Sequence, residues 1–301
     1  MGAKLRTVRR RIRSVQSTMK ITRAMELIAA SRILKAQQRV LAARPYAEQL
    51  TTAMEDVARQ TGALVHPLLE ERPDPQRAAV FIVTSDRGLA GAYNANVLRR
   101  SERVMGRLRG DGVEPVLFVV GRKGQSYFRF RGVPMAETWQ GISEVPAYDN
   151  AEEIGARLIG AFSEREVDAV HAVYTDFRSA FTLRPVDKRF LPIAPEEVSG
   201  TEGEPSAEYI FEPEPDEILG GLLPRYVTAK IFHAMLESAA SENAARRRAM
   251  KAATENAEDV IRRLTRVANQ ARQAEITTEL MEVVGGAEAL RQAAESEASH
   301  G

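Results

Sequence analysis

The sequence contains no cysteine among its 301 residues. This absence excludes a disulfide framework, a thiolate metal site, a cysteine nucleophile and control by thiol redox chemistry. The sequence also lacks the run of about 20 apolar residues that a membrane-spanning helix requires. Its basic N-terminus has no apolar segment of the kind found in secretory signals. We therefore expect a soluble, cytosolic protein with no direct membrane insertion.

Glycine and proline are missing from two long stretches, residues 3–44 and 225–284. Steps of three and four residues connect mostly apolar positions from Leu5 to Val40 and again from Leu222 to Ala271. A seam of period 3.5 indicates a left-handed coiled coil. Because the two stretches flank a central segment, they are expected to run antiparallel and side by side.

The two predicted helices differ in length, and this difference leaves one end without a partner. If Leu50 lies opposite Arg225, Leu5 lies near residue 270, and no part of the first helix reaches further. The next residues of the C-terminal helix nevertheless include a set of apolar side chains: Ile276, Leu280, Val283, Val284, Ala287 and Leu290. An unpartnered amphipathic helix end is unstable in water and suggests a socket on another protein.

The middle of the chain shows the alternation typical of an α/β domain. Short β-branched runs at residues 79–83, 116–120 and 169–174 predict strands buried on both faces. Helical patterns separate or follow them, at residues 92–108, 123–130 and 151–162. This order predicts a mainly parallel, Rossmann-like sheet. Residues 182–193 are expected to add an edge strand, because Pro185 cannot donate a ladder hydrogen bond.

We therefore expect an α/β fold in which a long antiparallel coiled coil of N- and C-terminal helices carries an inserted Rossmann-like domain. The predicted segments are an N-terminal coiled-coil helix at 1–60, an α/β domain at 75–195, an acidic foot loop at 196–224, a C-terminal coiled-coil helix at 225–290 and a disordered tail at 291–301.

No motif in the sequence predicts catalysis. Residues 85–91 and 121–124 follow predicted strands, but they match neither a phosphate-binding loop nor a dinucleotide fingerprint. Tight turns that lead into helices explain their glycines. The four histidines show no ligand spacing, and an acid–base pair such as Asp86 and Asp176 is not distinguishable from background by sequence. We expect no catalytic, cofactor-binding or metal-binding residues.

Charge is distributed unevenly along the chain. Residues 1–44 hold twelve Lys or Arg and one acid, whereas residues 190–224 hold nine acids and no base. The basic helix has no aromatic residue before Tyr46 that could stack on bases, which argues against nucleic acid. A solvated basic face and a protein partner with acidic loops remain alternatives. The apolar island at residues 209–211 has two interpretations, a solvated loop or a docking segment.

Five stretches carry a resemblance to a known family: ITRAMELIAASR at 21–32, AARPYA at 42–47, SDRGLAGAYNAN at 85–96, AMKAATENA at 249–257 and ARQAEITTELMEVVGGAEAL at 271–290. In these stretches the chain resembles the gamma subunit of the bacterial rotary ATP synthase, the central-stalk rotor. The resemblance covers residues 1 to about 290.

The resemblance implies a shaft that couples rotation of a membrane ring to conformational change at the catalytic sites of a hexameric head. Its implied partners are the alpha and beta subunits of the head, the epsilon subunit and the ring of c subunits. The subunit itself would be non-catalytic in a proton-translocating complex, peripheral to the cytoplasmic face of the bacterial cell membrane. The implied partner contacts are Met25 and Arg246 at the lever loops, Arg272, Gln273 and Thr277 at the upper catch, and Tyr209, Phe211 and Glu212 at the foot.

Two alternatives belong to other functional classes. One is a structural scaffold that uses the coiled coil as a spacer, and a weaker one is a nucleotide-dependent enzyme that uses the sheet. Copurification with three copies each of two nucleotide-binding subunits distinguishes a rotor from both.

Overall fold

The computed structural model describes residues 3–61, 66–179, 182–194, 197 and 215–298. The chain divides into two compact units. The central unit is residues 27–249, and the terminal unit joins residues 1–26 with residues 250–301. The central unit therefore includes parts of both long helices together with the α/β domain, which the sequence interpretation had separated.

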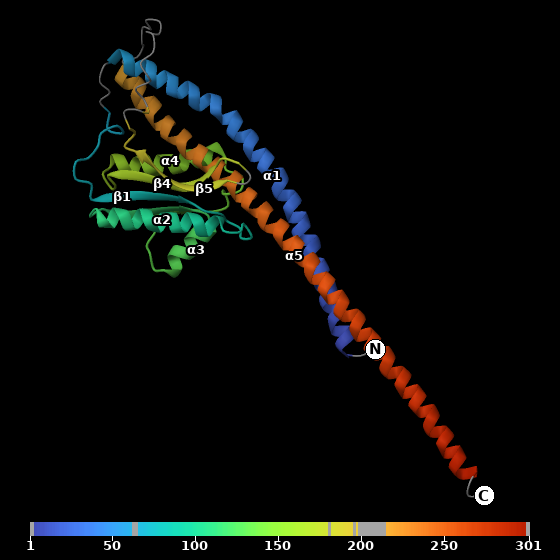
Figure 1. The fold of residues 1–301 in the computed structure, drawn as a ribbon. Coiled ribbons are helices and arrows are strands. Elements are labelled where there is room, and N and C mark those ends of the chain that lie inside the picture. Colours follow the sequence, from blue (N-terminus) through green and yellow to red (C-terminus); the bar gives the residue numbers. More distant parts are fainter. Residues whose placement is uncertain (1–2, 62–65, 180–181, 195–196, 198–214, 299–301) are drawn as a thin grey trace. The chain divides into compact units, whose positions relative to one another are not determined.

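A five-stranded sheet forms the centre of the α/β domain (Figure 1). The strands are β1 (Arg77–Val83), β2 (Glu114–Val120), β3 (Glu137–Trp139), β4 (Ala169–Phe177) and β5 (Leu183–Leu191), in the order β3-β2-β1-β4-β5. The first four strands pair in parallel, and β5 pairs antiparallel with β4 at one edge. The mainly parallel sheet and the edge strand containing Pro185 are confirmed, whereas the three-residue strand β3 was not predicted.

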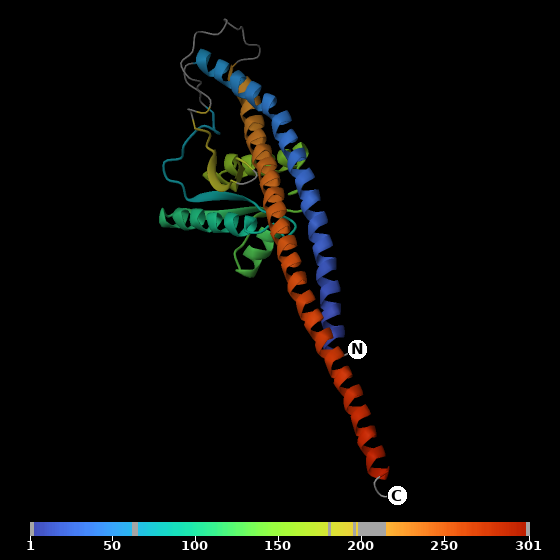
Figure 2. The ribbon, with the colours of Figure 1, turned by 45° about the vertical axis from the view of Figure 1, so that its right-hand side comes forward.

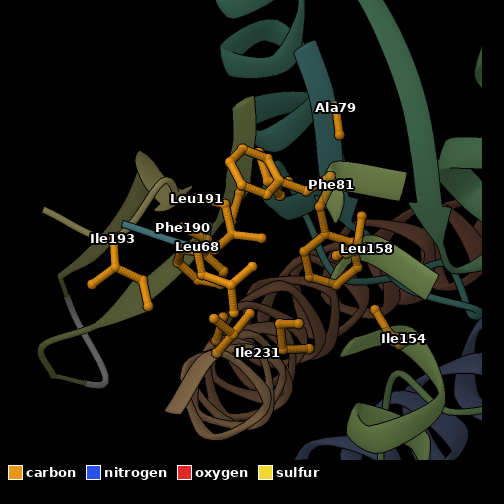
Figure 3. Packing of buried hydrophobic residues seen from close by; sticks show 14 of the residues in the cluster. Leu68, Ala79, Phe81, Ile154, Leu158, Phe190, Leu191, Ile193 and Ile231 are labelled. Carbon is orange, nitrogen blue, oxygen red and sulfur yellow. The ribbon is translucent and has the colours of Figure 1, made fainter. Parts of the chain in front are cut away.

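Helices cover both faces of this sheet, as the buried strands require. Helices α2 (Tyr93–Gly110) and α3 (Arg122–Phe130) lie on one face, and α4 (Tyr148–Ser163) lies on the other (Figure 1). Alternate residues of β1 point to opposite faces, so that Val80 packs in the cluster with α2 and α3, and Phe81 in the cluster with α4. Figure 3 shows Phe81 and Leu158 within the second cluster, which also contains Ile231 from α5.

The two long helices are α1 (Ala3–Thr61) and α5 (Pro215–Ala298). Helix α5 corrects the expected foot loop, because residues 215–224 are helical. Proline is favoured at the first position of a helix, and Leu219 and Leu223 are fully buried in the core, which outweighs the low helix propensity of Gly220 and Gly221. The expected disordered tail is also wrong for residues 291–298, where an Ala- and Glu-rich sequence continues the helix.

The terminal unit is an antiparallel helix pair (Figure 2). The Oγ1 atoms of Thr22 on α1 and Thr254 on α5 lie 2.8 Å apart in a buried hydrogen bond. This pair agrees with the predicted register to within one residue. The predicted seam is also confirmed, because it contains all the residues of α5 that are buried in the described part of this unit: Met250, Thr254, Ala257 and Ala268.

In the described part of the chain, no helix combines the length and apolar character that a bilayer crossing requires.

Candidate functional site

The C-terminal end of α5 carries the first candidate interaction surface. Beyond Ala271, no other described segment of the terminal unit runs beside the helix (Figure 2). Six large apolar side chains are 46–74% exposed here: Ile276, Leu280, Met281, Val283, Val284 and Leu290. The sequence predicted this unpartnered end from the difference in helix length, and its exposure is confirmed. So many exposed apolar groups on one segment are typical of a protein interaction site.

Three residues that the resemblance assigns to the upper catch lie at the start of this surface. Arg272, Gln273 and Thr277 are all exposed on α5. The Thr277 hydroxyl donates to the Gln273 carbonyl oxygen at 2.9 Å, a bond within the helix. The guanidinium and amide groups therefore remain at the surface of the chain, and their contact with a partner stays a prediction.

Met25 lies in the terminal unit, on the turn of α1 that follows Thr22. Its side chain is half-buried, and its neighbour Glu26 is buried and paired with Arg23 at 3.1 Å. The exposed part of Met25 is therefore a limited apolar surface beside an ion pair. Its role as a partner contact also stays a prediction.

Arg246 lies in the central unit and is buried, with only 6% of its side chain exposed. Its Nη2 lies 2.5 Å from Oε1 of Glu242, one turn earlier on α5. The same nitrogen donates to the carbonyl oxygens of Gly88 at 3.4 Å and Arg87 at 3.5 Å. Arg246 therefore connects α5 to the loop between β1 and α2, and in the chain alone its guanidinium is occupied by internal acceptors.

Glu144 adds a second carboxylate to this site. Its Oε1 lies 3.8 Å from Nη1 of Arg246, and its Oε2 accepts a hydrogen bond from Nη1 of Arg32 at 2.5 Å. Arg87 contributes a third guanidinium, 3.6 Å from the same Oε2. The sequence did not identify Glu144 or Arg32, since the members of this network come from segments that are far apart in the chain.

Glu242 is the more deeply buried carboxyl group of the network, with a side chain that is 1% exposed. Desolvation raises the pKa of Glu242, and the nearby Arg246 guanidinium opposes that shift. For Asp86, the hydrogen bonds that lower the pKa outweigh the burial that raises it. Burial acts to raise the pKa of Asp86, but hydrogen bonds from the backbone N–H groups of Gly141, Ser143 and Arg122 bring it below the ordinary value.

Asp86 therefore has a structural role at the end of β1. Its Oδ1 accepts from the backbone N–H of Arg122 and its Oδ2 from that of Ser143, both at 3.2 Å. Asp176, the other carboxylate considered from the sequence, pairs with Arg178 at 3.2 Å. Among the described residues, no group of three or more histidine and carboxylate side chains is arranged to hold a metal ion.

The glycines after the strands lie in turns that lead into helices, as the sequence interpretation proposed. Gly121 has φ of 92°, and a Cβ there would lie 2.3 Å from the Thr84 carbonyl oxygen. Gly91 has φ of 55° and lies against Ala249 of α5, whose Cβ would be 3.6 Å from an added Cβ. Gly121 thus requires glycine both for its positive φ and for the close approach of Thr84, whereas Gly91 requires it for its positive φ alone.

A groove that the sequence did not predict lies in the central unit between α1, α4 and α5. It encloses about 1140 Å³ and is lined by Leu41, Tyr46, Tyr148 and Phe232 among others. The Tyr148 ring makes edge-to-face contacts with Tyr46 at 6.3 Å and with Phe232 at 5.4 Å. Burial, followed by the hydrogen bond with Tyr46, raises the pKa of Tyr148 to about 12.

Three further residues assigned by the resemblance, Tyr209, Phe211 and Glu212, lie outside the residues that the structure describes.

Comparison with known proteins provides the family. The sequence profile of the family described as ATP synthase matches residues 4–290. An ATP synthase gamma chain from Acidothermus cellulolyticus is 56% identical over 298 residues, covering 96% of this chain and 98% of the relative. The corresponding protein from Mycolicibacterium smegmatis is 51% identical over 304 residues, covering 96% of this chain and 99% of the relative.

Solved structures show the same fold at low sequence identity. A chain of the Euglena gracilis mitochondrial ATP synthase superposes with a TM-score of 0.65 at 16% identity, covering 96% of this chain and 95% of that one. A chain from the central stalk and c-ring structure of the Tetrahymena thermophila mitochondrial enzyme gives 0.57 at 22% identity, with coverage of 77% and 99%. With the sequence matches above, these findings establish that the chain belongs to the family of ATP synthase gamma chains.

Proposed function

We propose that this protein is the central rotor shaft of a proton-translocating ATP synthase. In this role it couples rotation of a membrane ring to conformational change at the catalytic sites of the head. Its near-full-length match to bacterial gamma chains supports the assignment. Family membership also argues against a general coiled-coil scaffold as the function.

The observation that carries the mechanism is the exposed apolar end of α5. Ile276, Leu280 and Val284 are 46–59% exposed. In a ring of alpha and beta subunits, an apolar bearing would enclose these side chains while allowing the helix to turn, because hydrophobic contact is non-directional. Arg272, Gln273 and Thr277 would supply polar contacts to the same subunits.

The remaining partner contacts belong to the same proposal. Met25 would face acidic lever loops of the catalytic subunits. Arg246 would do so after its guanidinium exchanges an internal acceptor for a partner carboxylate, since its side chain is 6% exposed in the chain alone. Tyr209, Phe211 and Glu212 would contact the epsilon subunit and the c-ring. The complex would place this chain at the cytoplasmic face of the bacterial membrane as a peripheral subunit.

The subunit itself performs no bond chemistry in this proposal. A rotor acts because its contact energies differ from one orientation to the next, and each catalytic site responds by a shift in its conformational equilibrium. The asymmetry of the shaft is therefore what distinguishes the three sites of the head at any moment.

Native mass measurement of the complex purified through this chain tests the proposal. The expected result is one copy of this chain with three copies each of two nucleotide-binding subunits. Calorimetric titration of the free chain with Mg-ATP should show no saturable binding. A chain that purifies alone, or that binds Mg-ATP at micromolar concentration, would contradict the rotor function.

A further inference from the structure

Glu144 occupies a position that joins four segments of the central unit. It lies between β3 and α4, and its carboxylate faces Arg32 of α1, Arg87 of the β1–α2 loop and Arg246 of α5. Only 16% of the Glu144 side chain is exposed, and Arg32 is 35% exposed. One partly buried carboxylate therefore meets guanidinium groups from both long helices and from the loop that follows β1.

The residue before Glu144 holds the same segment to the sheet. The Ser143 backbone N–H donates to Oδ2 of Asp86 at 3.2 Å, and its hydroxyl accepts from the Asp86 backbone N–H at 2.9 Å. Two adjacent residues thus attach this short segment in two directions: Ser143 to the sheet, and Glu144 to the helices.

The charges of the network explain why Glu144 is needed in addition to Glu242. Arg246 already has a close carboxylate partner in Glu242, at 2.5 Å. The Arg32 guanidinium pairs with the Glu144 carboxylate, at 2.5 Å. Replacing Glu144 by a neutral residue would leave Arg32 without this partner and Arg246 with one carboxylate fewer. Breaking a partly buried pair in this way is costly, because one charge stays desolvated and uncompensated.

Apolar packing attaches the domain to α5 as well, through residues such as Leu223 and Ile231. Apolar contact stabilises the attachment but fixes orientation poorly, whereas charge-assisted hydrogen bonds require specific geometry. The apolar core therefore stabilises the contact between the domain and the helices, and the Arg32–Glu144 ion pair fixes the orientation of that contact.

We propose that Glu144 is a positioning residue that fixes the α/β domain in one orientation against α1 and α5 of the central unit. Torque applied to the α/β domain is then transmitted to α1 and α5 together, because the domain does not rotate separately from these helices. This inference rests on the rotor function proposed above and deepens it.

The first test measures amide hydrogen exchange in the free, full-length chain. Glu144→Gln should raise the exchange rate of the Ser143 amide, which donates to Asp86, about tenfold or more, because a charged hydrogen bond that holds this segment is lost. Arg32→Gln should have a similar effect, and the double variant should be no worse than either single one, because the two residues act as a pair. Glu144→Asp keeps the charge and should lie between the wild type and Glu144→Gln.

Glu166→Gln is the matched control. It removes an ion pair with Arg157, 2.9 Å in length, that lies within the α/β domain. Exchange of the Ser143 amide should remain at the wild-type rate in this variant. Additive effects of Arg32→Gln and Glu144→Gln, or an unchanged exchange rate in Glu144→Gln, would overturn the proposal.

The second test separates positioning from simple stability in the assembled complex. Proton pumping and ATP hydrolysis are measured in the same membrane vesicles. Glu144→Gln should lower the ratio of pumping to hydrolysis severalfold, Glu144→Asp should restore much of it, and Glu166→Gln should leave it unchanged. An unchanged ratio in Glu144→Gln would overturn the positioning role. Failure of the rotor function would instead appear as failure of the wild-type chain to assemble with a catalytic head.

Discussion

One helix, α5, passes through two different environments in the two units. In the central unit, every residue from 234 to 246 is buried except the half-buried Glu237. In the terminal unit, every residue from 276 to 291 is exposed. Both segments are helical, and both contain alanine and charged residues. The comparison shows that local sequence decides the helix, whereas the segments packed around it decide which of its faces are buried.

The two environments suit different tasks. The buried segment is held by an apolar core and by the ion pairs of Glu242 and Arg246, which fix its orientation. The exposed segment includes a hydrogen bond within the helix, from the Thr277 hydroxyl to the Gln273 carbonyl oxygen, and an apolar surface that a partner can enclose. Four predictions test this difference between the buried and the exposed regions.

The largest expected effect comes from one substitution made in each environment. Leu158→Ala removes a fully buried side chain in the central unit and should cost about 2–5 kcal/mol of unfolding free energy. Leu280→Ala changes a side chain that is 59% exposed and should cost less than about 0.5 kcal/mol in the free chain. Denaturant titration measures both. A loss for Leu280→Ala as large as that for Leu158→Ala would show that the end of α5 is packed against its own chain.

Amide exchange measures the contrast along α5 itself. Residues 276–284 should exchange rapidly in the free chain, because their backbone hydrogen bonds face solvent without tertiary cover. Residues 250–264, which include the buried Met250 and Thr254, should be protected. In the assembled complex, both segments should exchange slowly. Strong protection of residues 276–284 in the free chain would remove the physical basis of the bearing.

The buried carboxylate of Glu242 predicts a pH effect specific to the central unit. Its pKa is raised in the folded chain, so its favourable contribution is fully present below the ordinary glutamate pKa and is lost as pH rises through the folded value. The unfolding free energy of the wild type, minus that of Glu242→Gln, should therefore fall as the pH rises above the ordinary glutamate pKa of about 4.3. The control is Glu288→Gln, at an exposed position of the terminal unit, measured over the same pH range. A difference that grows with pH would mean that Arg246 outweighs desolvation.

The smallest expected effect concerns the buried hydroxyl pair of the terminal unit. Thr22→Val leaves the Thr254 hydroxyl without this partner and should cost about 0.5–1.5 kcal/mol. Thr254 keeps a second bond to the Met250 carbonyl oxygen at 2.9 Å, which limits the loss. The double variant Thr22→Val/Thr254→Val should recover part of it, because both partners are then apolar. Thermal unfolding of the two single variants and the double variant measures these losses in stability. Purely additive losses would argue against a direct hydrogen bond between the two hydroxyls.

Much of the fold was accessible from sequence because its signals are periodic and local. The seam from Met250 to Ala271, the buried strands and the helices between them follow from spacing and residue type. The errors lie where tertiary packing outweighs local preference: residues 215–224 form a helix in spite of Gly220 and Gly221, because Leu219 and Leu223 enter the core. Strand β3 has three residues, too few for a period to be recognised.

The candidate sites also divide into features that the sequence predicts and features that depend on the tertiary structure. The sequence by itself determined the two long helices, their antiparallel register and the apolar end beyond Ala271, since these depend on helix length and on repeats within one segment. Only the tertiary structure placed Arg32, Glu144 and Arg246 together, and only the tertiary structure buried Arg246. Ion pairs between segments separated by more than a hundred residues leave no periodic trace, because the fold alone brings those charges within a few ångströms of one another.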